Sequence, residues 1–228
     1  MELSELVPSV LQRFLWVPVR VLLTIFCSFE IRGREHVTDG ECNVIIASNH
    51  SSELDPIIIA ASLPFFSRHL PLFFTSREKA FYKNMGWKKM IYGGRFFNMW
   101  GAHQAYAGLK NYEQALPHHL RLLRRGNTLS IFPTGRRVLA GENVGARGGV
   151  SFLTHATKLP IVPALIQGAE RMSLGDFLLR KRTITITFGT PLFANDIFKN
   201  PESIIRNEVR NDYETAADTV MKKITQLA

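Results

Sequence analysis

The chain has 228 residues, 46% of them hydrophobic, and a formal net charge of +9 at pH 7. That is enough for one folded domain with a sizeable core, and no linker, repeat or low-complexity run divides it. The two cysteines, Cys27 and Cys42, exclude a disulfide framework and a cysteine-built zinc site, and they fit a reducing compartment. The basic charge balance indicates an anionic partner: nucleic acid, anionic lipid or an acidic small molecule.

The N-terminal stretch from Leu11 to Phe29 is nearly apolar, and only Arg13, Pro18 and Arg20 interrupt it. Its charge-free part, Val21 to Phe29, is shorter than the roughly 20 residues that a membrane span needs. The preceding residues are acidic, unlike the basic start of a secretory signal peptide. The sequence therefore shows no clear membrane span.

Two interpretations of this stretch stay open. A tryptophan, Trp16, and two arginines on an apolar helix are typical of a segment that lies in the membrane interface. An ordinary core helix, or a hairpin that packs on the domain, fits the same residues. We expect residues 1–32 to dock the protein peripherally on the cytoplasmic face of an anionic membrane, and residues 33–228 to form the folded domain.

Short apolar runs alternate with helical patterns along the rest of the chain. Strands are predicted at residues 43–48, 72–76, 95–100, 127–132, 161–167 and 183–189. Helices are predicted at residues 56–63, 78–85, 109–125, 149–158 and 201–227. This alternation predicts an α/β fold with a mostly parallel central sheet flanked by helices. Ligands of such sheets bind at the carboxyl ends of the strands.

A polar cluster follows the first of these strands. His50 and Asp55 are five residues apart, close enough for a tight turn to bring the carboxylate to one imidazole nitrogen. That contact would fix the histidine tautomer and leave the other nitrogen to take a proton from a substrate hydroxyl. The alternative is structural: Asn49, Ser51, Ser52 and Asp55 are all residues that cap a following helix.

A second polar cluster, "IFPTGRR", follows the strand at 127–132. Pro133 and Gly135 mark a tight turn. Arg136 and Arg137 are expected at the same edge of the sheet as His50, where guanidinium groups and backbone donors near Gly135 would bind an anion. A solvated basic loop is the alternative interpretation.

At this point the sequence resembles a family. The motifs "NHSSELDP", "FPTGRR", "GARGGVSFLTHATKLPIVPALIQG" and "ITITFGTPL", in this order between Cys42 and Leu192, are similar to those of glycerophospholipid acyltransferases of the lysophosphatidate acyltransferase type. The resemblance implies an α/β fold behind a membrane-docking helical segment, with no metal and no cofactor. It also implies that His50 is the general base and that Asp55 orients it.

The same resemblance implies the reaction and the substrate-binding residues. An acyl group moves from a thioester, on coenzyme A or acyl carrier protein, to the hydroxyl of a lysophospholipid or related lipid. Such an activated donor needs a base, an oxyanion site and positioning, but no protein nucleophile. Matched to the motifs, the residues expected to bind substrates are Asn49, Thr134, Gly135, Arg136, Arg137 and Arg147.

Two departures from the family pattern concern the acceptor site. Thr134 stands where the family has a glutamate, so we expect Arg136 and Arg137 to lack that carboxylate partner and the site to be more positive and more open. The second motif is best placed at "GAHQAYA", residues 101–107, which puts Tyr106 and Ala107 at the acidic and arginine positions. One phosphate-binding arginine is then missing, and Arg136, Arg95 or Lys110 is expected to substitute.

Other features leave alternatives. A hydrolase that uses water as acceptor, or a catalytically silent lipid- or nucleic-acid-binding module, would share the same composition. The aromatic and basic stretch at residues 78–100 fits a membrane interface or substrate tunnel first, a core second and nucleic acid last. His118 and His119 are expected at the surface, and no group of residues has the spacing of metal ligands.

Overall fold

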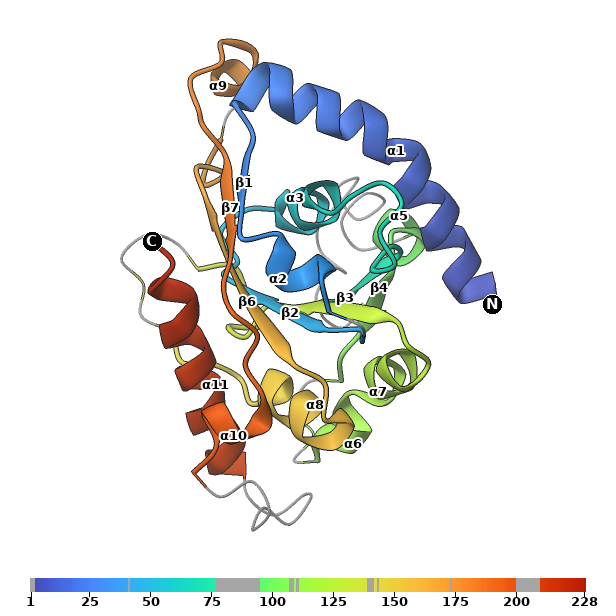
Figure 1. Ribbon diagram of the computed structural model, residues 1–228, viewed down its shortest axis with the longest axis vertical. Helices are drawn as coiled ribbons and strands as arrows, with labels where there is room; N and C mark the ends of the chain where they lie inside the picture. The colour runs from blue at the N-terminus through green and yellow to red at the C-terminus, as the bar shows by residue number, and fades with distance from the viewer. Residues whose placement is uncertain are drawn as a thin grey trace.

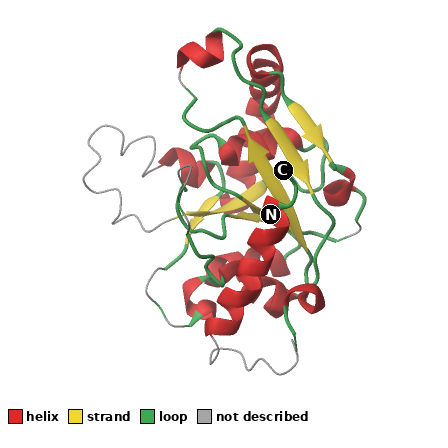
Figure 2. Ribbon diagram, turned by 90° about the vertical axis from the view of Figure 1, so that its left-hand side faces the viewer, coloured by secondary structure: helices red, strands yellow, loops and turns green. Residues whose placement is uncertain are grey.

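In a computed structural model, the described residues form a seven-stranded sheet with helices on both sides (Figures 1 and 2). The structure describes residues 3–40, 42–76, 95–106, 109, 111–138, 142, 144–172, 174–199 and 210–228. The strands are β1 (Glu30–Arg32), β2 (Ile45–Ser48), β3 (Leu72–Ser76), β4 (Ala102–Gln104), β5 (Thr128–Ile131), β6 (Ile161–Gln167) and β7 (Thr185–Phe188). The helices are α1 (Leu3–Cys27), α2 (Glu35–Thr38), α3 (Asp55–Ser62), α5 (Arg95–Met99), α6 (Tyr112–Ala115), α7 (Pro117–Arg124), α8 (Gly149–Thr157), α9 (Leu174–Leu178), α10 (Ala194–Ile197) and α11 (Arg210–Thr225).

The strand order is β1-β7-β6-β2-β5-β3-β4. Within the described residues, neighbouring strands run parallel except β6 and β7. Side chains of α6, α7, α8, α10 and α11 cover one face of the sheet, and those of α1, α2, α3, α5 and α9 cover the other. Burial on both faces explains why strands such as β2 and β6 are continuous apolar runs. The predicted α/β fold with a mostly parallel sheet is confirmed.

The predicted elements differ from the structure mainly where they are short or edge-located. The strands at 72–76 and 161–167 have the predicted bounds, whereas the strand predicted at 95–100 is wrong, because α5 occupies this segment. Phe96 and Trp100 stack at helical i, i+4 spacing, with ring centroids 6.0 Å apart. The helix predicted at 78–85 and the first part of the one at 201–227 lie outside the described residues.

The N-terminal segment forms one continuous helix, and Pro18 does not end it. By length and composition alone, Glu5–Cys27 meets the requirement for a helix that crosses a membrane, as buried helices of soluble proteins and signal sequences also do. The charge-free part, Val21 to Phe29, is too short for a span by itself, but the whole helix is long and apolar enough, so its length does not support the expectation of no clear span. The segment set apart as residues 1–32 also contains β1, which pairs with β7 as an edge strand of the sheet.

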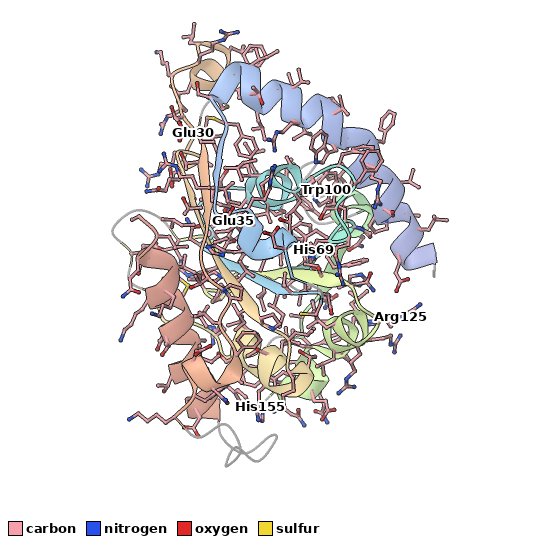
Figure 3. The ribbon with its side chains drawn as sticks, viewed as in Figure 1. Glu30, Glu35, His69, Trp100, Arg125 and His155 are labelled. Carbon is pink, nitrogen blue, oxygen red and sulfur yellow. The ribbon has the colours of Figure 1, made fainter. Side chains whose placement is uncertain are left out.

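The polar side chains of α1 point toward the rest of the protein. Gln12 is buried, donates to the carbonyls of Leu72 and Trp100 at 2.7 and 2.6 Å, and accepts from the Leu72 N–H. The indole N–H of Trp16 and a guanidinium N–H of Arg20 donate to backbone carbonyls at 2.9 and 2.7 Å. Figure 3 shows Trp100 on the inner side of this helix. The arginines and the tryptophan expected at a membrane surface therefore hold α1 on the domain.

The opposite face of α1 is apolar and exposed. Its exposed large apolar side chains are Leu6, Val10, Phe14, Val17, Val21, Leu22 and Ile25. These positions recur every three or four residues, so they form one stripe along the helix, here called the outer face of α1. A buried core helix would not leave such a stripe open to solvent, so the core-helix interpretation is wrong for this face.

Candidate functional site

The candidate site lies at the carboxyl ends of β2 and β5, which are neighbours in the sheet. Ala47 pairs with Ile131, so the loops that follow these two strands begin side by side. The N–H of Val138 donates to the His50 carbonyl at 2.8 Å and ties the two loops together. The two polar clusters, far apart in sequence, thus meet at one edge of the sheet, as predicted.

His50 and Asp55 are in direct contact. Nδ1 of His50 lies 2.9 Å from Oδ2 of Asp55, a fully buried carboxylate at the start of α3. The same Oδ2 accepts from the backbone N–H groups of Ser51 and Ser52 at 2.8 and 2.9 Å. Asp55 therefore holds both the imidazole and the turn before α3. The N-cap position, Leu54, has no side-chain cap hydrogen bond, so the structure does not bear out the capping alternative.

The imidazole of His50 is fixed in a second direction by Phe132. The two rings stack with centroids 4.1 Å apart and an angle of 17° between their planes. The other ring nitrogen, Nε2, has no hydrogen-bond partner among the described residues, and about 20% of the side chain is exposed. With a carboxylate at Nδ1, the neutral ring carries its proton there and presents the Nε2 lone pair outward, as a general base requires.

Asn49 continues the sheet beyond β2. Its side-chain amide donates to the carbonyl of Ile166 and accepts from the N–H of the same residue, both at 2.8 Å. These bonds fix the start of the His50 loop on β6. A role of Asn49 in substrate binding stays a prediction, and the contacts that the structure shows position the loop.

The turn after β5 is compact and internally bonded. Gly135 has φ +64°, a left-handed conformation that favours glycine, and its N–H donates to the Phe132 carbonyl at 2.9 Å. The hydroxyl of Thr134 is buried and donates to the Arg136 carbonyl at 2.8 Å. Arg147 N–H donates to the Pro133 carbonyl at 2.7 Å, which brings this arginine against the same turn. The Gly135 N–H is therefore used within the turn.

Both arginines of the turn have carboxylate partners, although neither partner is at position 134. Nη1 of Arg137 lies 2.7 Å from Oε1 of Glu53, and Nη1 of Arg136 lies 2.7 Å from Oε2 of Glu142. Sequence reasoning missed Glu53 because it lies 84 positions from Arg137. The one available signal was its place inside the His50–Asp55 motif. The loop is less positive than expected, because neutralising carboxylates come from outside the turn.

Several other predictions fall elsewhere. Tyr106 is exposed beyond β4, while Ala107, Lys110 and the side chain of Arg95 lie outside the described residues, so the second motif stays a prediction. The expectation for His119 is wrong: it is buried, and its Nε2 faces the His103 carbonyl at 3.2 Å. Burial, aided by nearby His103, lowers the pKa of His119 from 6.5 to about 3. His118 is exposed, as expected.

Two further observations bear on what the site can hold. Among the described residues, no group of three or more His, Cys, Asp or Glu side chains is placed to bind a metal ion. A hollow of about 510 Å³ opens between α1 and α2, where Arg20, Glu35 and Asp39 line it. None of the residues that line it belongs to the His50 site, so this hollow does not locate the chemistry. We place the site by the His50–Asp55 contact instead.

The fold and this constellation define a class. The protein is an α/β protein whose candidate base, His50, is held by a buried carboxylate at the carboxyl edge of the sheet, beside a loop with two arginines. His50 has no hydrogen bond to a serine, threonine or cysteine nucleophile within the described residues. Such an arrangement suits a reaction in which an activated donor is attacked by the substrate itself.

The acyltransferase family model matches residues 28–167, more than half of the chain, and the protein belongs to the acyltransferase family. A relative from Mycoplasma pneumoniae, named probable 1-acyl-sn-glycerol-3-phosphate acyltransferase, is 25% identical over 199 residues, or 80% of this chain. A second relative with the same name, from Mycoplasma genitalium, is 23% identical over 143 residues, or 61% of this chain. The matches span 65% and 48% of the lengths of these two relatives.

A solved structure shares the fold. The crystal structure of the 1-acyl-sn-glycerophosphate acyltransferase PlsC from Thermotoga maritima matches with a TM-score of 0.60 at 16% identity, covering 95% of this chain and 80% of that one. The resemblance stated from the motifs is confirmed at the level of family and fold.

Proposed function

We propose that the protein transfers an acyl group from a thioester of coenzyme A or acyl carrier protein to the hydroxyl of a lysophospholipid. The observation that carries the proposal is the His50–Asp55 contact, which leaves Nε2 of His50 without a partner among the described residues, at the carboxyl edge of the sheet. Family membership and the names of the two Mycoplasma relatives support the same substrate class.

The proposed step balances without a cofactor. Nε2 of His50 takes the proton of the acceptor hydroxyl while the hydroxyl oxygen attacks the thioester carbonyl. The carbon–sulfur bond then breaks, and the leaving thiolate receives the proton from the imidazolium. The buried carboxylate of Asp55 stabilises that imidazolium while it exists. Arg137, Arg136 and Arg147 surround the neighbouring turn and supply positive charge for a phosphate-bearing head group.

The outer face of α1 is the proposed membrane-docking surface. Polar anchors hold α1 to the domain on one side, so its apolar stripe faces outward and is available to the acyl region of a bilayer. The C-terminal end of α1 lies beside α9 (Figure 1), and there Phe26 stacks on Phe177 with ring centroids 5.0 Å apart. Leu178 and Leu179 are exposed beside this contact and extend the apolar surface. The exposed Arg180 and Lys181 follow and suit anionic lipid head groups.

Docking of this kind places the protein at the membrane as a peripheral protein. We assign it to the cytoplasmic face, because Cys27 and Cys42 are both free, as thiols are in a reducing compartment.

The proposal is tested with purified protein, a radiolabelled acyl thioester and a panel of lysophospholipids in mixed micelles. We expect labelled phospholipid, and His50→Ala should lower kcat by about 10²–10⁴-fold, the usual contribution of a general base. The variant also loses a hydrogen bond to the buried Asp55 carboxylate and the stack on Phe132, so the rates are compared at a temperature where both proteins are folded. Labelled free fatty acid with no labelled phospholipid would identify a hydrolase. A variant with more than about a tenth of the wild-type rate would exclude His50 as the base.

A further inference from the structure

The carboxylate that faces Arg137 comes from the loop that carries the candidate base. Glu53 lies between His50 and Asp55 in the chain, and its Oε1 is 2.7 Å from Nη1 of Arg137. The partner expected from within the turn is absent, because position 134 holds a threonine whose buried hydroxyl donates to a backbone carbonyl. The pair adds to the Val138–His50 backbone bond that joins the two loops.

This ion pair is exchangeable. The side chains of Arg137 and Glu53 are 48% and 38% exposed, so water competes for both and the pair contributes little to folding. A phosphomonoester has more charge than a carboxylate and a phosphodiester has the same charge, and both have more oxygens. Either can take over the guanidinium of Arg137. Once it does so, the carboxylate of Glu53 remains beside the bound head group.

The charge left by Glu53 affects head groups differently. A phosphomonoester carries a charge of about −1.5 to −2 near neutral pH and is repelled by the carboxylate. A zwitterionic head group carries one phosphodiester charge and an ammonium group, which can take the place of Arg137 at Glu53. The phosphodiester then pairs with Arg137 and the ammonium group pairs with Glu53, so neither side chain loses an oppositely charged partner.

Resting on the proposed acyl transfer, we propose that Glu53 sets the head-group preference of the acceptor site and favours zwitterionic lysophospholipids over phosphomonoester ones. Glu53 is a positioning and selectivity residue and does not touch the reacting atoms. Its carboxylate comes from the His50 loop, whereas the family pattern has its glutamate at position 134, within the turn itself.

The test compares wild-type protein with Glu53→Gln, which removes the charge and keeps the shape. Lysophosphatidate and lysophosphatidylethanolamine of one acyl chain length serve as competing acceptors. In Glu53→Gln, we expect the kcat/KM for the phosphomonoester relative to that for the zwitterion to rise about fivefold or more, which is the size expected for one surface charge contact. The change should appear in KM and not in kcat. Glu53→Asp, which keeps the charge, should restore most of the wild-type ratio.

Glu30→Gln is the matched control. Glu30 pairs with Arg32 at the same 2.7 Å distance and is similarly exposed, but it lies on β1 at the edge of the sheet (Figure 3). This variant loses the same charge and should leave the ratio unchanged. An equal rise in Glu30→Gln would show that net charge, and not Glu53, sets the preference, and would overturn the inference.

A binding measurement separates this inference from the proposed function. Glycerol 3-phosphate and glycerophosphoethanolamine are titrated into the wild-type and Glu53→Gln proteins by calorimetry. A shift of relative affinity toward glycerol 3-phosphate supports the role of Glu53 even if no acyl transfer is found. Active enzymes with an unchanged kcat/KM ratio and unchanged relative affinity would refute the role of Glu53 and leave the acyltransferase function standing.

Discussion

Replacing Asp55 by asparagine separates the two roles of this carboxylate. In the wild type, Oδ2 accepts from His50, Ser51 and Ser52, and Oδ1 is buried with no partner among the described residues. An asparagine oxygen at the Oδ2 position can keep the three bonds. Its NH₂ group then occupies the Oδ1 position, where a buried donor without a partner costs about 1–3 kcal/mol. For a chain of this size, each kcal/mol lowers the melting temperature by about 2–4 °C.

The catalytic effect of Asp55→Asn should be larger than the effect on stability. The neutral amide no longer stabilises the imidazolium that forms during the reaction, so we expect kcat to fall by about 10²-fold, the lower end of the range for a general base. The assay is single-turnover acyl transfer at a temperature where circular dichroism shows both proteins fully folded.

Ser52→Ala is the control for damage to the turn alone. The Ser52 hydroxyl accepts from the Leu54 N–H at 3.2 Å, and the structure shows no hydrogen bond between this hydroxyl and the imidazole. Its loss should cost about 1 kcal/mol of stability and leave kcat within about twofold. The catalytic assignment would be refuted if Asp55→Asn, fully folded, loses no more activity than Ser52→Ala does. Asp55 would then only hold the turn.

Two further predictions concern stability and the membrane. The unfolded chain binds a proton at His119 below pH 6.5, whereas the folded protein, with its pKa near 3, does not. The unfolding free energy should therefore fall by up to about 1.4 kcal/mol for each pH unit that the pH is lowered from 6.5 to 4. Urea titrations at several pH values should show that the unfolding free energy of His119→Gln depends less on pH than that of the wild type. Phe14→Glu with Val10→Glu, on the outer face of α1, should lower sedimentation with anionic vesicles at least about tenfold without unfolding the protein. Unchanged sedimentation would contradict the docking surface.

Much of the sheet could be predicted because both of its faces are buried. The apolar run at 161–167 allows only a buried strand of that length, since Pro160 and Gly168 bound it. The run at 95–100 is rich in aromatic residues, but aromatic residues at i and i+4 also pair on a helix, and periodicity over six residues does not separate a strand from a helix. The short edge strand β4 has no apolar pattern of its own, and it is a strand because it pairs with β3.

The candidate site was predictable where its parts are close in the chain. The five-residue spacing of His50 and Asp55 was enough to predict their contact. Partners distant in sequence were not predictable: Glu53 for Arg137, Phe132 for the ring of His50, and His103 for His119. For α1, composition gave the apolar character, but only the packing shows that the polar residues face the domain.

The contacts of α1 with the domain fix the rotation of this helix about its own axis. Glu5 and Arg125 join its N-terminal end to the end of α7, and Gln12, Trp16 and Arg20 join the rest to the domain, so helix and sheet turn together (Figure 3). On the proposed docking through the outer face of α1, this attachment sets the angle between the bilayer plane and the sheet edge formed by the carboxyl ends of β2 and β5. Successive residues of a helix differ by about 100° around its axis. One residue inserted between two anchors would therefore rotate part of the outer face of α1 by about that angle. The protein would then bind the bilayer in a different orientation, and the distance of His50 from the bilayer would change.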